Sequence, residues 1–396
     1  MEDDKNKNVP QFNSFENYSP KHPINPQGRG ARMHKINHWL QKHRIPVIIV
    51  VLLIILGIGG GYIYAIRSLK FEVATSTPLI EKKLSVKIYS PLTGAEVSSA
   101  SSKRPVTAIM IENSPDARPQ SGLKESGVVF EAIAEGGITR FLTLHQEDQP
   151  QLIGPVRSLR PYYVDWLAAF NPSVAHVGGS AKALAEIRNG SYRDIDQFFN
   201  GNSYWRAKDR YAPHNVYTSF DKLDALNQKK GYTSSDFSGF PRVAPSDRNP
   251  TKKTQVKAGS TPPSAANPAT KINVTISSPL YNSSYTYDAT SGLYTRSEGG
   301  KIHADREAGP IMPKVVIVIE SPVSQVFEDG YRESYQTIGT GKAYVFQNGS
   351  VTTGNWTKTA KTSQIKFTDT AGKEILLERG QTWITAIDPG KSVTWQ

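Results

Sequence analysis

An uninterrupted apolar run near the N-terminus constrains this chain more than any other feature. Residues 47–66 read VIIVVLLIILGIGGGYIYAI and contain no charged side chain. A helix of this length rises about 30 Å, which matches the hydrocarbon core of a bilayer. We therefore predict a transmembrane helix at 47–66, with the lipid bilayer as its partner. A cleaved signal peptide is the alternative, but its apolar core is usually only about 7–15 residues long.

The flanks of this run predict its orientation. Residues 1–46 hold eight Lys and Arg and four acidic residues, whereas only Arg67 and Lys70 follow closely. Because cytoplasmic flanks are enriched in basic residues, we expect a single-pass cell-membrane protein with a cytoplasmic N-terminus and extracytoplasmic C-terminal domains. The chain has no cysteine, which excludes disulfides and a lipid-modified cysteine, so we expect the polypeptide itself to be the anchor.

Composition divides the rest of the chain into folded and polar segments. The predicted fold class is α+β, with a mixed α/β lobe followed by a mainly antiparallel β lobe. The Pro-, Ser-, Thr- and Lys-rich stretch between the lobes is typical of a linker. The predicted segments are a disordered basic tail at 1–46, the membrane helix at 47–66, a stalk at 67–85, an N-terminal domain at 86–245, the linker at 246–270 and a C-terminal β domain at 271–396.

Runs of apolar and β-branched residues predict the individual elements. In the N-terminal domain we expect strands at 106–112, 128–134, 138–146 and 173–177, and helices at 161–170 and 181–188. In the C-terminal domain we expect strands at 274–276, 314–320, 335–338, 343–347, 351–356, 364–368 and 382–387. The sequences QNGS at 347–350 and TAGK at 370–373 predict hairpin turns.

Five motifs of the N-terminal domain combine polar side chains with Gly and Pro, and several follow the ends of predicted strands. Loops of this kind often carry function. The motifs are IENSPDARPQSGL at 111–123, VFEAIAEGGITRF at 129–141, GPVRSLRPYYVDW at 154–166, HVGGSAKA at 176–183 and APHNVY at 212–217.

Four arginines lie in these motifs, and a guanidinium presents a planar fork of donors that suits carboxylate or phosphate. If Arg118, Arg140, Arg157 and Arg160 converge, they form an anion pocket. The alternative is that each arginine pairs with a nearby acid and holds loops together. The acids available for such pairing are Asp116, Glu131, Glu135 and Asp165.

Ser180 follows Gly-Gly and precedes a predicted helix, which makes it an expected N-cap. The sharper hypothesis makes it a nucleophile with Lys182, His176 or His214 as the base. Glu131 and Glu135 are four apart on a predicted strand, so a shared face and a paired-carboxylate site are a further hypothesis. The candidate ligand-binding residues are Glu112, Asn113, Arg118, Glu135, Arg140, Arg157, Arg160, His176, Ser180, His214 and Asn215.

The sequence lacks the motifs of several common kinds of functional site. It contains no P-loop, dinucleotide fingerprint, zinc-protease helix motif or EF-hand loop, and no specific nucleic-acid motif. The histidines and acids are scattered without metal-ligand spacing, so we expect neither a metal nor a cofactor. No residue is assigned a catalytic role from sequence.

The same five motifs, together with three in the C-terminal domain, carry a resemblance. The latter are YTYDATSGLYTR at 285–296, GTGKAYVFQNGSVTTGNW at 339–356 and GKEILLERGQTWI at 372–384. The chain resembles the YerB-like family of bacterial surface proteins, with N- and C-terminal DUF3048 domains of unknown function. The resemblance implies an exported, surface-anchored protein and no established activity. Family members resemble lipoproteins, and this chain departs from them by using a membrane helix, so lipid anchoring does not carry over.

Three functions follow as hypotheses. The first is an extracytoplasmic binding module for an anionic or glycan ligand of the envelope, such as a cell-wall polymer, which the formal net charge of +12 favours. The second is an envelope hydrolase or transferase that uses Ser180 or a carboxylate together with His214. The third is a structural scaffold, for which the charge serves solubility alone.

Overall fold

The computed structural model describes residues 44–68, 87–244, 267–326 and 332–396. By its contacts the chain divides into two compact units, Met1–Leu84 and Ser85–Gln396, and the second is called the soluble unit below. The predictions for the tail before residue 44, for most of the stalk and for nearly all of the linker lie outside the described residues.

The apolar run forms a single helix in the first unit, as predicted. Helix α2 (Arg44–Ser68) contains a segment, Ile48–Ser68, that is long and apolar enough to cross a membrane. Pro46 lies in its first turn, where a missing backbone N–H removes no helical hydrogen bond. The aliphatic side chains along α2 are exposed.

The N-terminal half of the soluble unit is built on strands predicted from their apolar residues. They are β3 (Thr107–Glu112), β4 (Val128–Glu135), β5 (Ile138–His145) and β6 (Ser173–Ala175). All six residues of β3 are buried, which explains its continuous apolar run. The predicted helices are also present, as α4 (Pro161–Leu167), which continues into a 3-10 turn at Ala168–Phe170, and α5 (Ala181–Asn189).

The C-terminal half contributes strands to two sheets. One is a five-stranded antiparallel sheet in the order β13-β12-β11-β10-β23. Its strands are β10 (Lys271–Val274), β11 (Ser283–Asp288), β12 (Leu293–Glu298), β13 (Lys301–Ile302) and β23 (Val393–Trp395). The other strands of this half are β16 (Val315–Glu320), β19 (Gly339–Gln347), β20 (Ser350–Lys358), β21 (Lys366–Asp369) and β22 (Thr382–Ile387).

The second sheet joins the two halves. It has twelve strands, ten of them along the path β21-β20-β19-β16-β22-β4-β5-β3-β6-β7, where β7 is Arg193–Asp194. Strand β22 lies between β16 and β4 and is parallel to both. The predicted α+β class is confirmed, and the two domains expected from sequence share one sheet within one compact unit.

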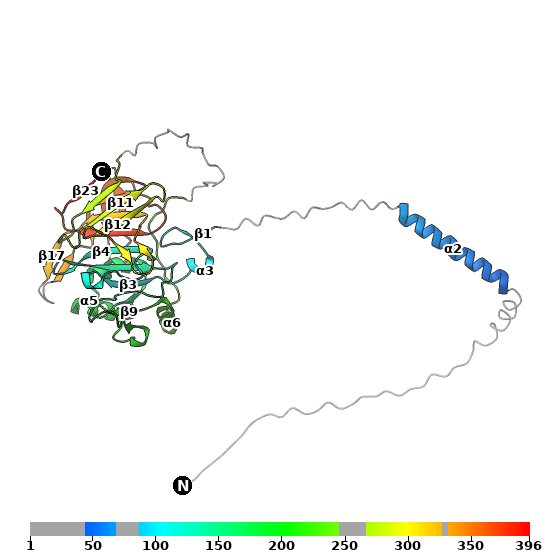
Figure 1. Cartoon of the computed structure of the whole chain (residues 1–396), viewed down its shortest axis with the longest axis horizontal. Helices are drawn as coiled ribbons and strands as arrows, with labels where there is room; N and C mark the ends of the chain where they lie inside the picture. Colours follow the sequence, from blue (N-terminus) through cyan, green and yellow to red (C-terminus); the bar gives the residue numbers. More distant parts are fainter. Residues whose placement is uncertain (1–43, 69–86, 245–266, 327–331) are drawn as a thin grey trace, which may run out of the picture. The chain divides into compact units, whose positions relative to one another are not determined.

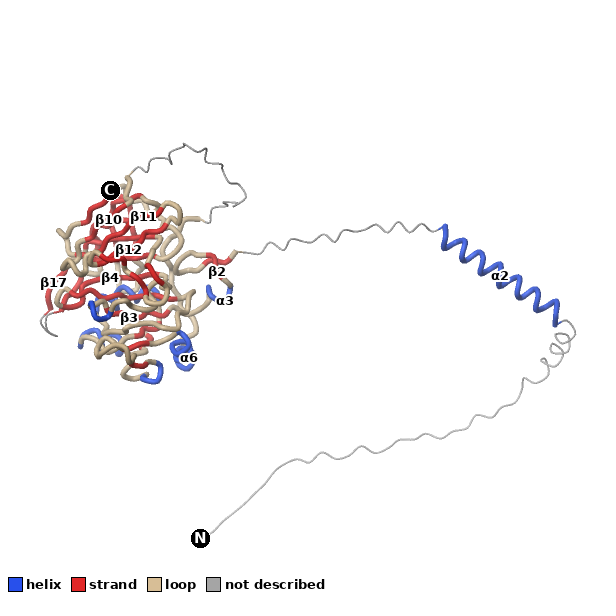
Figure 2. Tube along the Cα trace, in the orientation of Figure 1, coloured by secondary structure: helices blue, strands red, loops and turns tan. Residues whose placement is uncertain are grey.

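Different layers cover the two faces of the central strands β4 and β5. In Figures 1 and 2, β11 and β12 lie on one side of β4, and helix α6 (Phe220–Lys230) lies on the other. On the helical face Phe130 stacks on Trp166, with ring centroids 5.4 Å apart. On the opposite face Phe141 packs edge-on against Trp383 at 5.3 Å. Side chains on the two faces of these strands therefore enter two separate environments.

The remaining elements are short, and one prediction among them is wrong. The strand expected at 335–338 is instead β18 (Arg332–Tyr335), which forms a hairpin with β17 (Val323–Val326). The other short elements are β1 (Ile88–Tyr89), β2 (Glu96–Val97), α3 (Ser99–Ser102), β8 (Trp205–Arg206), β9 (Val216–Tyr217), β14 (Ala304–Asp305), β15 (Gly309–Pro310) and 3-10 turns at Pro115–Ala117 and Gly201–Ser203.

Candidate functional site

The five polar motifs meet at one edge of the central sheet. Parallel strands β3 and β6 end there, and the antiparallel β5 begins there. Backbone hydrogen bonds then join the loops that follow. The Glu112 amide donates to Pro155 at 2.9 Å, Val156 donates to Val216 at 2.7 Å, and Val177 donates to Arg157 at 3.0 Å. The motifs therefore form one continuous surface, although up to about a hundred residues separate them in sequence.

A carboxylate lies at the centre of this surface. Glu112 ends β3 and is almost fully buried. Its Oε1 lies 2.9 Å from Nδ1 of His214 and 3.2 Å from Nε of Arg157, and it accepts a hydrogen bond of 3.0 Å from the Ser114 hydroxyl. We call these four residues the Glu112 cluster. It brings together candidates that the sequence spreads over three motifs.

The Glu112 cluster leaves several polar atoms without protein partners. Among the described residues, Nη1 and Nη2 of Arg157 have no hydrogen-bond partner, and its side chain is 24% exposed. The Oε2 atom of Glu112 is buried without a partner. The nearest acidic oxygen to Nε2 of His214 is Oδ2 of Asp116, at 3.9 Å. Arginine donors and one imidazole nitrogen therefore remain available beside a fixed carboxylate.

Asn113 connects this cluster to the opposite face of the sheet. Its side-chain amide donates to Thr139 and to Glu298, each at 2.6 Å. Its carbonyl accepts from Nε of Arg118 at 3.0 Å and from Gln120 at 2.8 Å. Both Asn113 and Arg118 therefore hold the loop after β3 against the C-terminal half, which is a structural role.

A second group of charges lies buried between the two sheets, and of its members only Glu131 was considered from sequence. Arg296 on β12 donates to Glu131 on β4 at 2.8 Å and to Nδ1 of His303 at 2.7 Å, and its guanidinium lies 4.6 Å from the Trp383 ring centroid. Glu298 lies 3.6 Å from Arg296. We call Glu131, Arg296, Glu298, His303 and Trp383 the Arg296 network.

Burial and a neighbouring negative charge shift the pKa of Arg296 in opposite directions. Burial alone would lower the pKa of Arg296, but Glu131 raises it above its usual value. The pKa of His303 is lowered by burial and by Arg296, so its Nδ1 remains a hydrogen-bond acceptor. Because all these side chains are nearly inaccessible to solvent, the network joins the two halves and has no surface for a ligand.

Glu135 forms a third group, with Arg140 and Arg160. Arg140 donates to one carboxylate oxygen at 2.8 Å, and Arg160 donates to the other at 2.6 Å. Burial alone would raise the pKa of Glu135, but the two arginines lower it to about 2. Arg160 also lines a cavity of about 40 Å³ with Ser180. The alternative prediction, that motif arginines pair with nearby acids, holds for this pair.

The shared face expected for Glu131 and Glu135 is wrong. The register of β4 against β5 shifts between Ile133 and Glu135. As a result Glu131 pairs with Arg296 on the face toward β12, while Glu135 pairs with Arg140 on the helical face. A bulge of this kind re-aims every later side chain of a strand, so the two carboxylates do not form one site.

Ser180 and His176 occupy structural positions. The Ser180 hydroxyl accepts from the Ala183 amide and caps α5, and no described histidine or lysine contacts it. Nδ1 of His176 lies 2.7 Å from the Gly178 carbonyl oxygen, and Nε2 lies 3.1 Å from a carboxylate oxygen of Asp194. Since both ring nitrogens face acceptors, His176 has no nitrogen left to act as a base for Ser180.

Asn215 also organises its own loop. Its side-chain amide donates to the carbonyls of Ala207 and Arg210, each at 3.2 Å, and its oxygen accepts from Arg206 at 2.7 Å. These bonds hold the loop that carries His214. Within the described ranges, no group of three or more His, Asp or Glu side chains has the arrangement of a metal site.

Comparison with known proteins identifies relatives of this chain. Residues 92–233 match the N-terminal domain, and residues 272–384 the C-terminal domain, of a protein family of unknown function, DUF3048. The chain is 32% identical over 305 residues to the "Putative lipoprotein YerB" of Bacillus subtilis (strain 168), which covers 76% of this chain and 86% of that protein. The crystal structure of the Bacillus subtilis YerB protein matches with a TM-score of 0.66 at 29% identity, over 78% of this chain and 100% of that one. Because both domains match in order and the relative covers most of the chain, this protein belongs to the YerB-like family of DUF3048 proteins.

Proposed function

We propose that this protein is a membrane-anchored protein of the cell envelope whose soluble unit binds an anionic ligand at the Glu112 cluster. The observation that carries the proposal is the state of Arg157. Arg140 and Arg160 neutralise Glu135, and Arg118 is bonded to the loop after β3, whereas Arg157 keeps both terminal nitrogens free among the described residues.

The geometry around Arg157 suits an oxyanion. A guanidinium can bind a carboxylate or phosphate through two parallel hydrogen bonds. Glu112 lies against Nδ1 of His214, and in the imidazolium form of the ring Nε2 can donate a third bond to the same anion. The soluble unit carries 35 basic and 29 acidic side chains, and this excess of positive charge favours the approach of anionic polymers.

The anchor is the second part of the proposal. The relative in Bacillus subtilis is named as a putative lipoprotein, whereas this chain has helix α2 and no cysteine. We propose that α2 crosses the membrane once, with the basic N-terminal flank in the cytoplasm. Protease treatment of intact cells should then digest the soluble unit. Digestion only after lysis would show that the orientation is reversed.

Retention on purified cell-wall polymers tests the ligand. Arg157→Ala should abolish retention of the detergent-solubilised protein, because it removes the free guanidinium. Arg104→Ala is the matched control, since Arg104 is 23% exposed but its guanidinium is paired with Asp224. If both variants are retained like the wild type, the site is not at Arg157. If both are lost equally, retention reflects charge alone.

The pair formed by Glu112 and His214 supports a second candidate, an envelope hydrolase. A carboxylate that holds Nδ1 leaves Nε2 to act as a general base on water, with Arg157 stabilising the developing negative charge. The Ser114 hydroxyl contacts the same Nδ1, so it does not form a serine–histidine–acid relay. Cleavage of wall polymer by the wild type, lost in His214→Gln while retention persists, is the result this candidate requires.

A further inference from the structure

A surface groove of about 340 Å³ lies next to the Glu112 cluster. Its lining includes Trp205, Arg206, Lys208, Asp209, Tyr217 and Arg306. Trp205 and Arg206 form strand β8, which pairs with β9. Only Asn215 separates β9 from His214. The Ala207 amide donates to the Asn215 carbonyl at 2.8 Å, so the groove and the His214 loop are parts of one folded segment.

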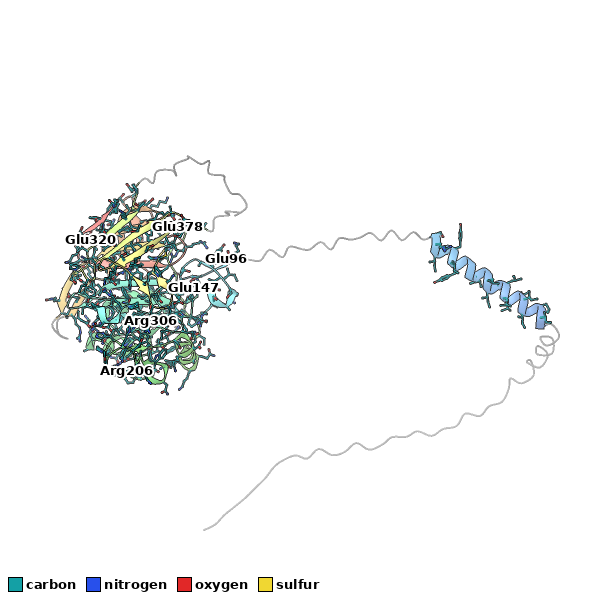
Figure 3. All side chains as sticks on the ribbon, in the orientation of Figure 1. Glu96, Glu147, Arg206, Arg306, Glu320 and Glu378 are labelled. Atoms are coloured by element: carbon teal, nitrogen blue, oxygen red, sulfur yellow. The ribbon has the colours of Figure 1, made fainter. Side chains whose placement is uncertain are left out.

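The groove carries more positive than negative charge. Arg306 donates to Asp209 at 2.7 Å, which neutralises one cation. Within the described part of the chain, the side-chain hydrogen bond of Arg206 goes to a neutral oxygen, that of the Asn215 side chain. Lys208 is exposed and has no hydrogen-bond partner among the described residues. Two cations without an acidic partner among the described residues, Arg206 and Lys208, therefore line this groove. Figure 3 labels Arg206 and Arg306 on the soluble unit.

The same groove presents an aromatic ring. Trp205 is partly exposed, so its ring can be covered by the apolar face of a flat or chair-shaped ring. Tyr217 is fully buried with its hydroxyl beside Arg306, so it is part of the wall of the groove.

We propose that this groove binds an acidic glycan, with a sugar ring on Trp205 and its carboxylate or phosphate at Arg206 and Lys208. Cations alone would suit any anion, whereas a cation pair beside an exposed indole selects anions that also carry a ring. The inference rests on the proposed function by naming the class of its ligand, but none of the groove residues belongs to the Glu112 cluster.

Tetragalacturonate is a defined probe, because each of its units combines a pyranose ring with a carboxylate. Saturation-transfer NMR on the detergent-solubilised full chain should show transfer to its ring protons. Maltotetraose lacks the charge and tetraglutamate lacks the ring, so each should bind at least about tenfold more weakly, the effect of losing one interaction of ordinary strength.

Variants then locate the binding. Trp205→Ala and Lys208→Gln should each weaken tetragalacturonate binding by about tenfold, and Trp205→Tyr should restore part of the loss. Lys366→Gln is the matched control, since Lys366 is an exposed lysine on β21, the edge strand of the large sheet, and should leave binding unchanged. Lys208 is exposed, so its variant tests the site even if Trp205→Ala fails to fold.

Three results would overturn the inference. They are no binding of tetragalacturonate by the wild type, equal binding of tetraglutamate, and unchanged binding in both groove variants. Arg157→Ala separates this inference from the proposed function. If that variant keeps wall-polymer retention while the groove variants lose tetragalacturonate, the groove binds glycan and the site proposed at Arg157 is wrong. The converse result leaves the Glu112 cluster as the binding site and rejects the groove.

Discussion

The Arg296 network and the Glu112 cluster are built from the same residue types but differ in what surrounds them. Both combine arginine, glutamate and histidine. In the Arg296 network the arginine is sealed between two sheets and covered by the Trp383 ring. In the Glu112 cluster the carboxylate and Ser114 are buried, while Arg157 and His214 reach solvent.

This difference separates stability from function. Charges without access to water must be compensated internally, so removing one partner leaves an expensive unpaired charge. Charges at a surface gain little from pairing, because water screens them, and they remain able to exchange partners for a ligand. Substitutions in the buried network should therefore change folding, and those in the exposed cluster should change binding.

The largest effect on stability is expected for Arg296→Met. It leaves Glu131 and Glu298 buried without their shared cation, which should lower the free energy of unfolding by roughly 3–5 kcal/mol. Urea denaturation of the solubilised protein measures this loss. Adding Glu131→Gln to the same variant should recover part of it. A single variant as stable as the wild type would contradict the role assigned to the network.

Acidic pH should reduce the folding stability that the ion pairs of Glu135 contribute. The arginines hold the pKa of Glu135 near 2, below the value of 4.5 for an unperturbed glutamate. A lowered folded-state pKa stabilises the protein above pH 4.5, and that contribution is lost as the pH falls toward 2. Denaturation curves across this range should show a smaller fall in stability for Glu135→Gln than for the wild type. Parallel curves would show that the ion pairs add nothing, since partly exposed pairs are screened.

Ser180→Ala should cost about 1 kcal/mol of stability, because it removes the N-cap of α5. Ser180→Asn offers an alternative capping group and should restore most of the stability. Thermal melting measures both variants. A Ser180→Ala protein with normal stability but no cleavage of wall polymer would instead support Ser180 as a nucleophile.

The smallest effect on stability is expected for Arg157→Ala, less than about 1 kcal/mol. The same variant should lose retention on wall polymers, so the two measurements should diverge more here than at Arg296 or Ser180. If Arg157→Ala instead lowers the melting temperature and leaves retention intact, the cluster is a scaffold and the contrast between the two regions collapses.

Sequence patterns predicted the strands whose side chains are apolar. The boundaries of β22 match the prediction, and the Asn348-Gly349 turn joins β19 to β20 with positive φ at both residues, as this residue pair favours. Strands β11 and β12 were missed. The buried residues of β12 are Tyr294, Arg296 and Glu298, so its inward face does not look apolar.

The sequence predicted which motifs form the candidate site, but not which arginine pairs with which acid. The five motifs meet, because strand ends at one edge of a sheet gather the loops that follow them. Which arginine meets which acid depends on strand register and on the bulge before Glu135, and neither is visible in residue types. Arg296 was overlooked because its partner Glu131 lies 165 positions away in the chain.

The position of β22 has a consequence for how the protein is made. Strand β4 is translated within the first 135 residues, yet one of its edges pairs with residues 382–385. Until those residues emerge, β4 presents an apolar strand edge, which is a template for association with other chains. Pairing across such a separation is also slow. Truncated or stalled products that end before β22 should therefore aggregate, and the nascent chain should depend on a chaperone until it is nearly complete.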